Sequence, residues 1–252
     1  MKLKDALIQV AEIAGLDANA LIAYAAEDTV GGRDTGGKWS AMSVFESEGR
    51  FLYALTRALK PTLIVEIGVA GGGTTTHLLS ALRANDHGHL WSVDIAADCG
   101  LQVPDGLRDR WMFNVADALT IELPSHADLV FEDGAHGLDF TRAILKRIKA
   151  TAPHVIVSHD FYSHEVYGGF AVKQAWDEEL PDGIGIKLDD AFTGLGYWVN
   201  PAWEVPEPAT KEPAIVEEPV PPMLASAPIV HSSRPVPEKP RRGRKPGTGK
   251  RS

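Results

Sequence analysis

The sequence contains little cysteine and no long apolar run. Cys99 is the only cysteine in 252 residues, so no disulfide can form within the chain, and a reducing, cytoplasmic location is expected. No stretch approaches the roughly 18 apolar residues that a membrane-spanning helix requires, so no membrane partner is expected. The first residues combine an acidic Asp5 with helical apolar spacing, which predicts an amphipathic helix rather than a signal peptide.

Proline is scarce in the first 200 residues and frequent afterwards. Of the 17 prolines, 12 lie in residues 201–252. This segment has too little apolar content to offset the entropy of ordering, and we expect it to be a disordered tail. Hydrophobic residues make up 44% of the chain, enough for a sizeable core in the remainder. The expected organisation is N-terminal helices and a loop over residues 1–38, one domain over 39–200, and the tail.

Negative charge dominates the part that is expected to fold. Residues 1–200 contain 16 Lys and Arg against 28 Asp and Glu, whereas residues 201–252 contain 9 against 6. An acidic body repels phosphates, so it is not expected to bind polyanions in general. Any contact with nucleic acid is expected from the tail.

Short apolar runs alternate with helical periodicity from about residue 62 onward. Strands are expected at residues 62–67, 89–94, 110–114, 128–131 and 155–158. Helices are expected near residues 3–14, 17–27, 43–59, 74–85, 138–150 and 170–180. The alternation predicts an α/β fold with a Rossmann-like, doubly wound, mostly parallel sheet, closed by an antiparallel final strand from segments 185–189 and 197–200. Ligands of such sheets bind at the carboxyl ends of the strands.

The strongest functional signal is the glycine-rich turn after the first of these strands. Glu66 precedes the turn, which opens directly into a helix and contains Gly68, Gly71, Gly72 and Gly73. Glycine lets the backbone approach a ligand, and a helix N-terminus offers unpaired N–H groups. Dinucleotide-binding folds use similar turns, and a turn needed only for packing is the other reading. Glu66 favours a cationic ligand, because a carboxylate suits the sulfonium and amino-acid portion of S-adenosylmethionine and would repel a pyrophosphate.

The second strand ends in an acidic residue, Asp94. A carboxylate at this place can accept hydrogen bonds from both ribose hydroxyls of a nucleotide. Nicotinamide enzymes share the feature, so it supports an adenosine-type cofactor without separating the two kinds. A solvated strand-end aspartate is the alternative.

Two later strands each end near an aspartate and a histidine. Asp133 is followed by His136, and His159 directly precedes Asp160. Parallel neighbours would bring the two carboxylates together, where they repel unless a cation joins them or one is protonated. Mg²⁺ is the cation expected at such oxygen ligands, and the nearby imidazoles also permit Mn²⁺ or Zn²⁺. The alternative is that one aspartate caps a helix while the other faces water. His159 is expected to have a supporting or structural role.

Residues 39–200 resemble class I S-adenosylmethionine-dependent methyltransferases, in particular the small-molecule O-methyltransferases of the catechol and macrocin types. Residues 48–52, Glu-Gly-Arg-Phe-Leu, resemble the Glu-Gly-x-Phe-Leu that precedes the first strand in the catechol type. The turn from Glu66 to Gly73 matches the cofactor-binding motif of this family. Asp94 matches its ribose-binding acidic residue.

The resemblance extends to the expected acceptor site. Asp117, in Ala-Asp-Ala, resembles the aspartate of an element beside the adenine, and Asp133 and Asp160 fall on two metal-ligand aspartates. His136 stands where the catechol type has a catalytic lysine, and Phe161 stands where it has an asparagine ligand. The Asp-Gly-x-His form is more similar to the sugar- and macrolide-modifying relatives.

The resemblance implies methyl transfer from S-adenosylmethionine to an oxygen of a small molecule or sugar, with a divalent cation as helper. Asp133 and His136 are the expected catalytic residues, with His136 removing the acceptor's proton; a neighbour of a helix start is the other reading of His136. Three other functions stay open: a methyltransferase acting on DNA or a modified base, a non-catalytic DNA-binding protein, and a nicotinamide oxidoreductase. The oligomeric state is left open.

The tail ends in a basic segment that resembles an AT-hook. Its core is Arg241, Arg242, Gly243, Arg244 and Lys245. In an AT-hook, an Arg-Gly-Arg core lies in the narrow minor groove of A·T-rich DNA, where arginines follow the negative potential. A·T-rich DNA is therefore an expected partner, with a plain solubility or localisation element as the alternative.

Overall fold

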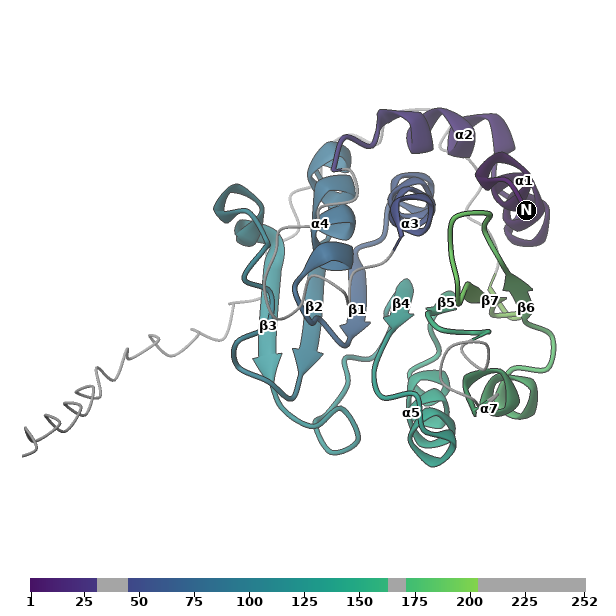
Figure 1. Ribbon diagram of the computed structural model, residues 1–252. Coiled ribbons are helices and arrows are strands. Elements are labelled where there is room, and N and C mark those ends of the chain that lie inside the picture. The colour runs from purple at the N-terminus through teal and green to yellow at the C-terminus, as the bar shows by residue number, and fades with distance from the viewer. Residues whose placement is uncertain (31–44, 163–170, 204–252) are drawn as a thin grey trace, which may run out of the picture. The chain divides into compact units, whose positions relative to one another are not determined.

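The computed structural model describes residues 1–30, 45–162 and 171–203, whose helices and strands are arranged as Figure 1 shows. They form a seven-stranded sheet in the order β3-β2-β1-β4-β5-β7-β6. The strands are β1 (Leu63–Ile67), β2 (His89–Asp94), β3 (Trp111–Val115), β4 (Leu129–Glu132), β5 (Val155–Ser158), β6 (Ile184–Ile186) and β7 (Leu195–Val199).

The first five strands are parallel, and strand order reverses between β1 and β4. Every residue of β4 and β5 is buried, as expected for parallel strands covered on both faces. The carboxyl ends of β1, β2, β4 and β5 therefore meet along one edge at the switch point, where such sheets bind ligands. The α/β, mostly parallel sheet predicted from the sequence is confirmed.

Helices cover both faces of this sheet (Figure 1). They are α1 (Leu3–Ala14), α2 (Ala18–Glu27), α3 (Glu46–Leu59), α4 (Gly73–Asn85), α5 (Leu138–Ala150) and α7 (Ala171–Glu179), with a short 3₁₀ helix η2 (Asp105–Arg110) before β3. Helices α1 to α4 share one apolar core with the sheet, which includes Leu55 and Phe131. Helices α5 and α7 share the other, which includes Ile144 and Trp176.

A buried hydrogen bond fixes the N-terminal helices to the rest of the fold. Asp28, the residue after α2, lies 2.7 Å from Nδ1 of His77 on α4, and both residues are almost fully buried. Burial opposes ionisation of the carboxyl, but the hydrogen bond and the charge of His77 hold the pKa of Asp28 below its usual range. Gly49 on α3 lies under the His77 ring, which a Cβ at that position would overlap. The hydrogen bond joins the end of α2 to α4, and Gly49 lets α3 pack closely against the same His77 ring.

The antiparallel edge of the sheet differs in detail from the expectation. β7 pairs with β6 as predicted, but it also pairs with β5 and so lies inside the sheet. Gly185 and Gly196 face each other in these strands, and a Cβ on either would press on the ring of Phe161. The two glycines leave room for that ring, which packs edge-on against Trp176.

The sequence-predicted domain limits at residues 38 and 200 stay predictions, and the basic tail segment lies outside the described residues. Within the described ranges, none of the helices is both long enough and apolar enough to cross a membrane.

Candidate active site

The glycine turn after β1 connects the two halves of the candidate site. Gly68 has a φ of 86°, a conformation that L side chains rarely adopt. A Cβ at Gly68 would overlap the backbone oxygen of Asp133, in the loop after β4. The Asp133 N–H in turn donates to the Ile67 carbonyl, at 2.8 Å. Only glycine permits this close approach, so the turn and the β4 loop form one unit.

The far side of the turn leads into α4. Gly72, with a φ of 91°, is the N-cap of α4, and no side chain caps this helix start. The turn is fastened by hydrogen bonds from the N–H groups of Gly100 and Gln102 to the carbonyls of Ala70 and Gly71. Gly73 is the first residue of the helix. An N-terminus without a side-chain cap suits the carboxylate of an amino-acid-like ligand.

Asp94 at the end of β2 holds the same turn from the side. Its Oδ2 accepts hydrogen bonds from the N–H groups of Val69 and Ala70, at 2.9 and 3.2 Å, and its Oδ1 accepts from Ala96 at 3.0 Å. Burial raises the pKa of the carboxyl, but these backbone donors outweigh it and hold the pKa below its usual range. A carboxylate has about four acceptor sites. Asp94 is half-buried and therefore keeps acceptor capacity for a ligand such as a ribose.

Glu66 lies beneath the turn. Its side chain is fully buried, and its carboxyl oxygens accept hydrogen bonds from the hydroxyls of Thr75 on α4 and Ser92 on β2. Burial raises the pKa of Glu66 to about 8, against the opposing effect of the two hydroxyls. Glu66 therefore ties β1, β2 and α4 together under the glycines. Its sequence-based role as a direct neighbour of the cofactor stays a prediction.

Asp117 follows β3 at the outer end of the site. Its side chain is exposed and accepts a hydrogen bond from the Leu119 N–H at 2.8 Å, closing a local turn. β3 pairs in parallel with β2, so Asp117 lies at the same edge of the sheet as Asp94, where both strands end. Contact with an adenine stays a prediction.

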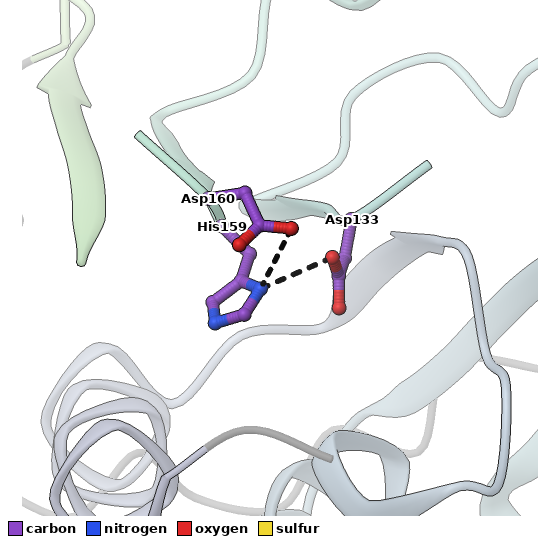
Figure 2. A group of neighbouring side chains, drawn as sticks. All are labelled: Asp133, His159 and Asp160. Atoms are coloured by element: carbon purple, nitrogen blue, oxygen red, sulfur yellow. Dashed lines mark hydrogen bonds and ion pairs between the residues drawn. The ribbon is translucent and has the colours of Figure 1, made fainter. Parts of the chain in front are cut away.

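Asp133, His159 and Asp160 meet at the ends of β4 and β5 (Figure 2). Nδ1 of His159 lies 3.2 Å from Oδ1 of Asp133 and 3.7 Å from Oδ2 of Asp160. One potential ligand atom from each of the three residues lies within 4.8 Å of the other two. The sequence-based expectation that the two carboxylates converge is thus met by the geometry.

The charge balance of this cluster rests on its histidines. Burial favours the neutral acids, but His159 and His136 hold the pKa values of Asp133 and Asp160 below their usual range. Burial likewise disfavours the protonated rings, but Asp133 and Asp160 raise the pKa of His136 to about 10. Asp133 and Glu48 raise the pKa of His159 well above its usual range. Each carboxylate is therefore balanced by an adjacent positive charge.

His136 lies on the open side of the cluster. Its Nε2 is 2.6 Å from Oδ2 of Asp160 and 3.7 Å from Oδ1 of Asp133, and about a third of its side chain is exposed. His159 is more enclosed, with 11% of its side chain exposed. The two histidines thus contact the same two carboxylates, and His136 is the one that a solvent-borne molecule can reach.

Two buried acids near the cluster received no role from the sequence. Glu48 on α3 lies 3.1 Å from Nε2 of His159 through its Oε2. Glu132 at the end of β4 accepts hydrogen bonds from the Ser158 hydroxyl and the Gly134 N–H, and burial raises its pKa. The resemblance of residues 48–52 to a family motif could have drawn attention to Glu48. The sequence around Glu132 contains no comparable motif, because a single acid at the end of an apolar run has no distinctive spacing.

The cluster fits a divalent cation by its chemistry. For metal–ligand bonds of about 2.1 Å, neighbouring donors lie roughly 3.0–3.4 Å apart, close to the separations around Nδ1 of His159. Phe161 cannot take part, because its side chain is buried in the core against Trp176. Two carboxylates and an imidazole nitrogen are therefore the donors that the described residues offer.

The comparisons with known proteins agree with this geometry. Residues 65–161 match a family model described as a methyltransferase domain. The fold is similar to the S-adenosylhomocysteine-bound methyltransferase PaMTH1 of Podospora anserina, with 14% identity, a TM-score of 0.51, and coverage of 77% of this chain and 94% of that one. It is also similar to cofactor-bound Rv0187 from MTB, with 19% identity, a TM-score of 0.53, and coverage of 72% and 88%. A search of curated proteins gave no match.

The matched residues run from the strand that carries Glu66 to the loop that carries Asp160, and so include the glycine turn, Asp94 and the acidic cluster. The matched residues define a methyltransferase domain, and the fold around them is similar to that of cofactor-bound methyltransferases.

Proposed function

We propose that the protein transfers the methyl group of S-adenosylmethionine to a hydroxyl oxygen of a small molecule or sugar, with a divalent cation at Asp133 and Asp160. One observation carries the proposal: the Gly68 turn and the Asp133 loop touch each other. A methyl donor held by the turn and an acceptor held at the carboxylates would therefore be neighbours. Such placement converts an encounter of two molecules into a reaction within one complex.

The donor side uses the turn, the α4 N-terminus and Asp94. In the proposed complex, the first-turn N–H groups of α4 hold the carboxylate of the methionine portion. The remaining acceptor capacity of Asp94 binds the ribose hydroxyls, while its three backbone hydrogen bonds keep the turn in shape. The methyl sulfonium is already reactive, so the protein needs to align it and to dispose of the acceptor's proton.

The acceptor side uses the cluster at β4 and β5. A divalent cation there would act as a Lewis acid on the acceptor hydroxyl, and Asp133 and Asp160 are the carboxylates able to hold it. His136 is the more exposed histidine. A bound cation would neutralise Asp133 and Asp160, the carboxylates that raise the pKa of His136, and would leave a neutral ring placed to take the proton. A hydroxyl acceptor is favoured because hard oxygen atoms suit a carboxylate-held cation.

The proposal is tested with radiolabelled S-adenosylmethionine and a panel of catechols, sugars and amines, with and without EDTA. We expect label in hydroxyl acceptors, a loss of turnover with EDTA, and recovery on adding Mg²⁺ or Mn²⁺. His136→Ala should abolish turnover, and His136→Lys should restore part of it. Transfer to amines alone, unaffected by EDTA and by His136→Ala, would contradict both the acceptor and the mechanism.

A further inference from the structure

We propose that His159 is itself a ligand of the cation, through Nδ1, and that the buried Glu48 on α3 orients its ring for this purpose. The inference rests on the proposed cation site and goes beyond it in two respects. It assigns His159 as a third ligand of the cation. It also assigns Glu48, on helix α3, the role of orienting the His159 ring. A nitrogen ligand also changes which cation the site prefers.

The two nitrogens of the His159 ring both face carboxylates. Nε2 lies 3.1 Å from Oε2 of Glu48, and Nδ1 lies 3.2 Å from Oδ1 of Asp133. The same Oε2 already accepts the Phe45 N–H and is therefore an acceptor atom, so Nε2 carries the hydrogen directed at Glu48. Nδ1 then presents a lone pair to two carboxylates, which is repulsive unless a cation lies between them. That cation is a proton or a metal ion.

The spacing around Nδ1 suits a metal ion. The separations of 3.2 Å to Asp133 and 3.7 Å to Asp160 bracket the roughly 3.4 Å expected between tetrahedral ligands at about 2.1 Å from a metal. Small side-chain adjustments would bring all three donors into one coordination sphere. His136 completes the opposite side of the cluster and leaves His159 as the enclosed nitrogen donor.

Glu48 has the properties of a residue that orients a metal-bound histidine. Its side chain has no exposed surface, and its Oε2 also accepts the Phe45 N–H at 3.2 Å, which fixes the carboxylate to the start of α3. Among the described residues, its buried Oε1 has no hydrogen-bond partner. A buried carboxylate with spare acceptor capacity is costly for stability alone. Metal-bound histidines commonly donate their second N–H to such a carboxylate, which sets the tautomer and raises ligand basicity.

The donor set predicts the choice of metal. Two carboxylates alone suit Mg²⁺, whereas an added imidazole shifts preference toward Mn²⁺, Co²⁺ or Zn²⁺. Glu48 acts on the cation only through His159 and is a positioning residue. Its effect should therefore appear in metal affinity and in the nitrogen signal of the bound ion, not only in turnover.

The test is performed on full-length protein freed of metal with EDTA and reloaded with Mn²⁺ alone. Electron spin echo modulation of the Mn²⁺ reports a coordinated nitrogen, and calorimetry gives the affinities for Mn²⁺ and Mg²⁺. We expect a nitrogen signal that persists in His136→Ala and disappears in His159→Ala. His159→Ala should also reduce the preference for Mn²⁺ over Mg²⁺, and Glu48→Gln should weaken Mn²⁺ binding ~10- to 100-fold.

A matched histidine control is present at the other end of the sheet. His154 lies 3.2 Å from Asp128 and is half exposed; it directly precedes β5, whereas His159 follows the end of that strand. His154→Ala should leave both Mn²⁺ affinity and the nitrogen signal unchanged. Binding of S-adenosylhomocysteine to each variant verifies that it is folded.

Two results separate this inference from the proposed function. If Asp133→Asn abolishes Mn²⁺ binding while His159→Ala keeps the nitrogen signal and the metal preference, the cation site stands and the role of His159 is overturned. If wild-type protein binds neither Mn²⁺ nor Mg²⁺, the cation site itself is wrong and the inference falls with it.

Discussion

At the scale of single residues, the site is built from acids placed in different surroundings. Asp94 is surrounded by backbone N–H groups and stays ionised, whereas Glu66 is buried between two hydroxyls and holds its proton up to about pH 8. The sequence identified both positions, because each stands at the end of a strand beside the glycine turn. It did not show that Glu66 points into the core, since orientation depends on Thr75 and Ser92 from other elements.

Replacing Glu66 by glutamine should change how stability depends on pH. The pKa of Glu66 is raised from 4.5 to about 8, so the folded protein keeps a proton there that the unfolded chain releases above about pH 4.5. The free energy of unfolding should therefore fall between pH 4.5 and 8, by at most about 1.4 kcal/mol per pH unit from this group. Glu66→Gln should flatten that slope in urea unfolding at pH 5, 6, 7 and 8. Glu122→Gln, at an exposed position, should not; equal slopes in wild type and Glu66→Gln would refute the assignment.

Replacing Asp94 by asparagine should weaken cofactor binding. The amide keeps the size of the side chain but loses the charge and part of the acceptor capacity that the turn and the ribose require. We expect a loss of about 1.5–3 kcal/mol in the binding of S-adenosylhomocysteine, roughly 10- to 100-fold in Kd. Asp105→Asn removes the same charge from a fully exposed residue and serves as the control. Equal affinities in the two variants would show that Asp94 makes no cofactor contact.

At the scale of elements, the sequence predicted the parallel strands and the helices between them closely. Buried apolar runs such as Val155–Ser158 carry their own signal, because both faces of a central strand are covered. The 3₁₀ helix Asp105–Arg110 was not predicted, since it is short and has no buried residue. The insertion of β7 between β5 and β6 was also missed. It depends on how distant segments pack, with Gly196 beside the Phe161 ring, and not on local periodicity.

The contact between the glycine turn and the β4 loop can be broken with one methyl group. Gly68→Ala would force a Cβ onto the Asp133 backbone oxygen at a φ of 86°, so the turn must move. We expect a loss of more than about 1 kcal/mol of stability and a larger loss of cofactor affinity. Gly137→Ala is the matched control, because nothing lies within 4 Å of its Cβ and its φ is −73°. If urea unfolding and cofactor titration give the same values for both variants, the close approach is unimportant.

At the scale of the whole molecule, charge separates the acidic body from the basic end of the sequence. Residues 1–200 carry an excess of acidic groups, and the Arg241–Lys245 segment lies in the basic end. This division predicts that the two parts have separate tasks: cofactor and acceptor for the body, and A·T-rich DNA for the basic segment. The prediction of DNA binding comes from the Arg-Gly-Arg pattern of the basic segment alone and does not depend on any contact within the fold.

Removing residues 204–252 should abolish DNA binding and leave cofactor binding intact. Full-length protein should prefer A·T-rich over G·C-rich duplex, with an affinity that falls steeply with salt because counterions are released. Replacing Arg242 and Arg244 together should remove the preference, whereas replacing Lys250 and Arg251 should weaken binding on all sequences alike. Fluorescence anisotropy with the two duplexes measures both effects. Absence of any A·T preference at low salt would refute the hook, and loss of DNA methylation on truncation would replace the small-molecule acceptor by DNA.

The most direct test of the central claim is a calorimetric titration of the full-length protein with S-adenosylhomocysteine and, separately, with NAD. The uncapped start of α4, the Gly68 turn and the free acceptor capacity of Asp94 predict one binding site for S-adenosylhomocysteine. The match of residues 65–161 to a methyltransferase domain predicts no comparable binding of NAD. Saturable binding of S-adenosylhomocysteine with no response to NAD would support the account. Tight binding of NAD with no response to S-adenosylhomocysteine would contradict it.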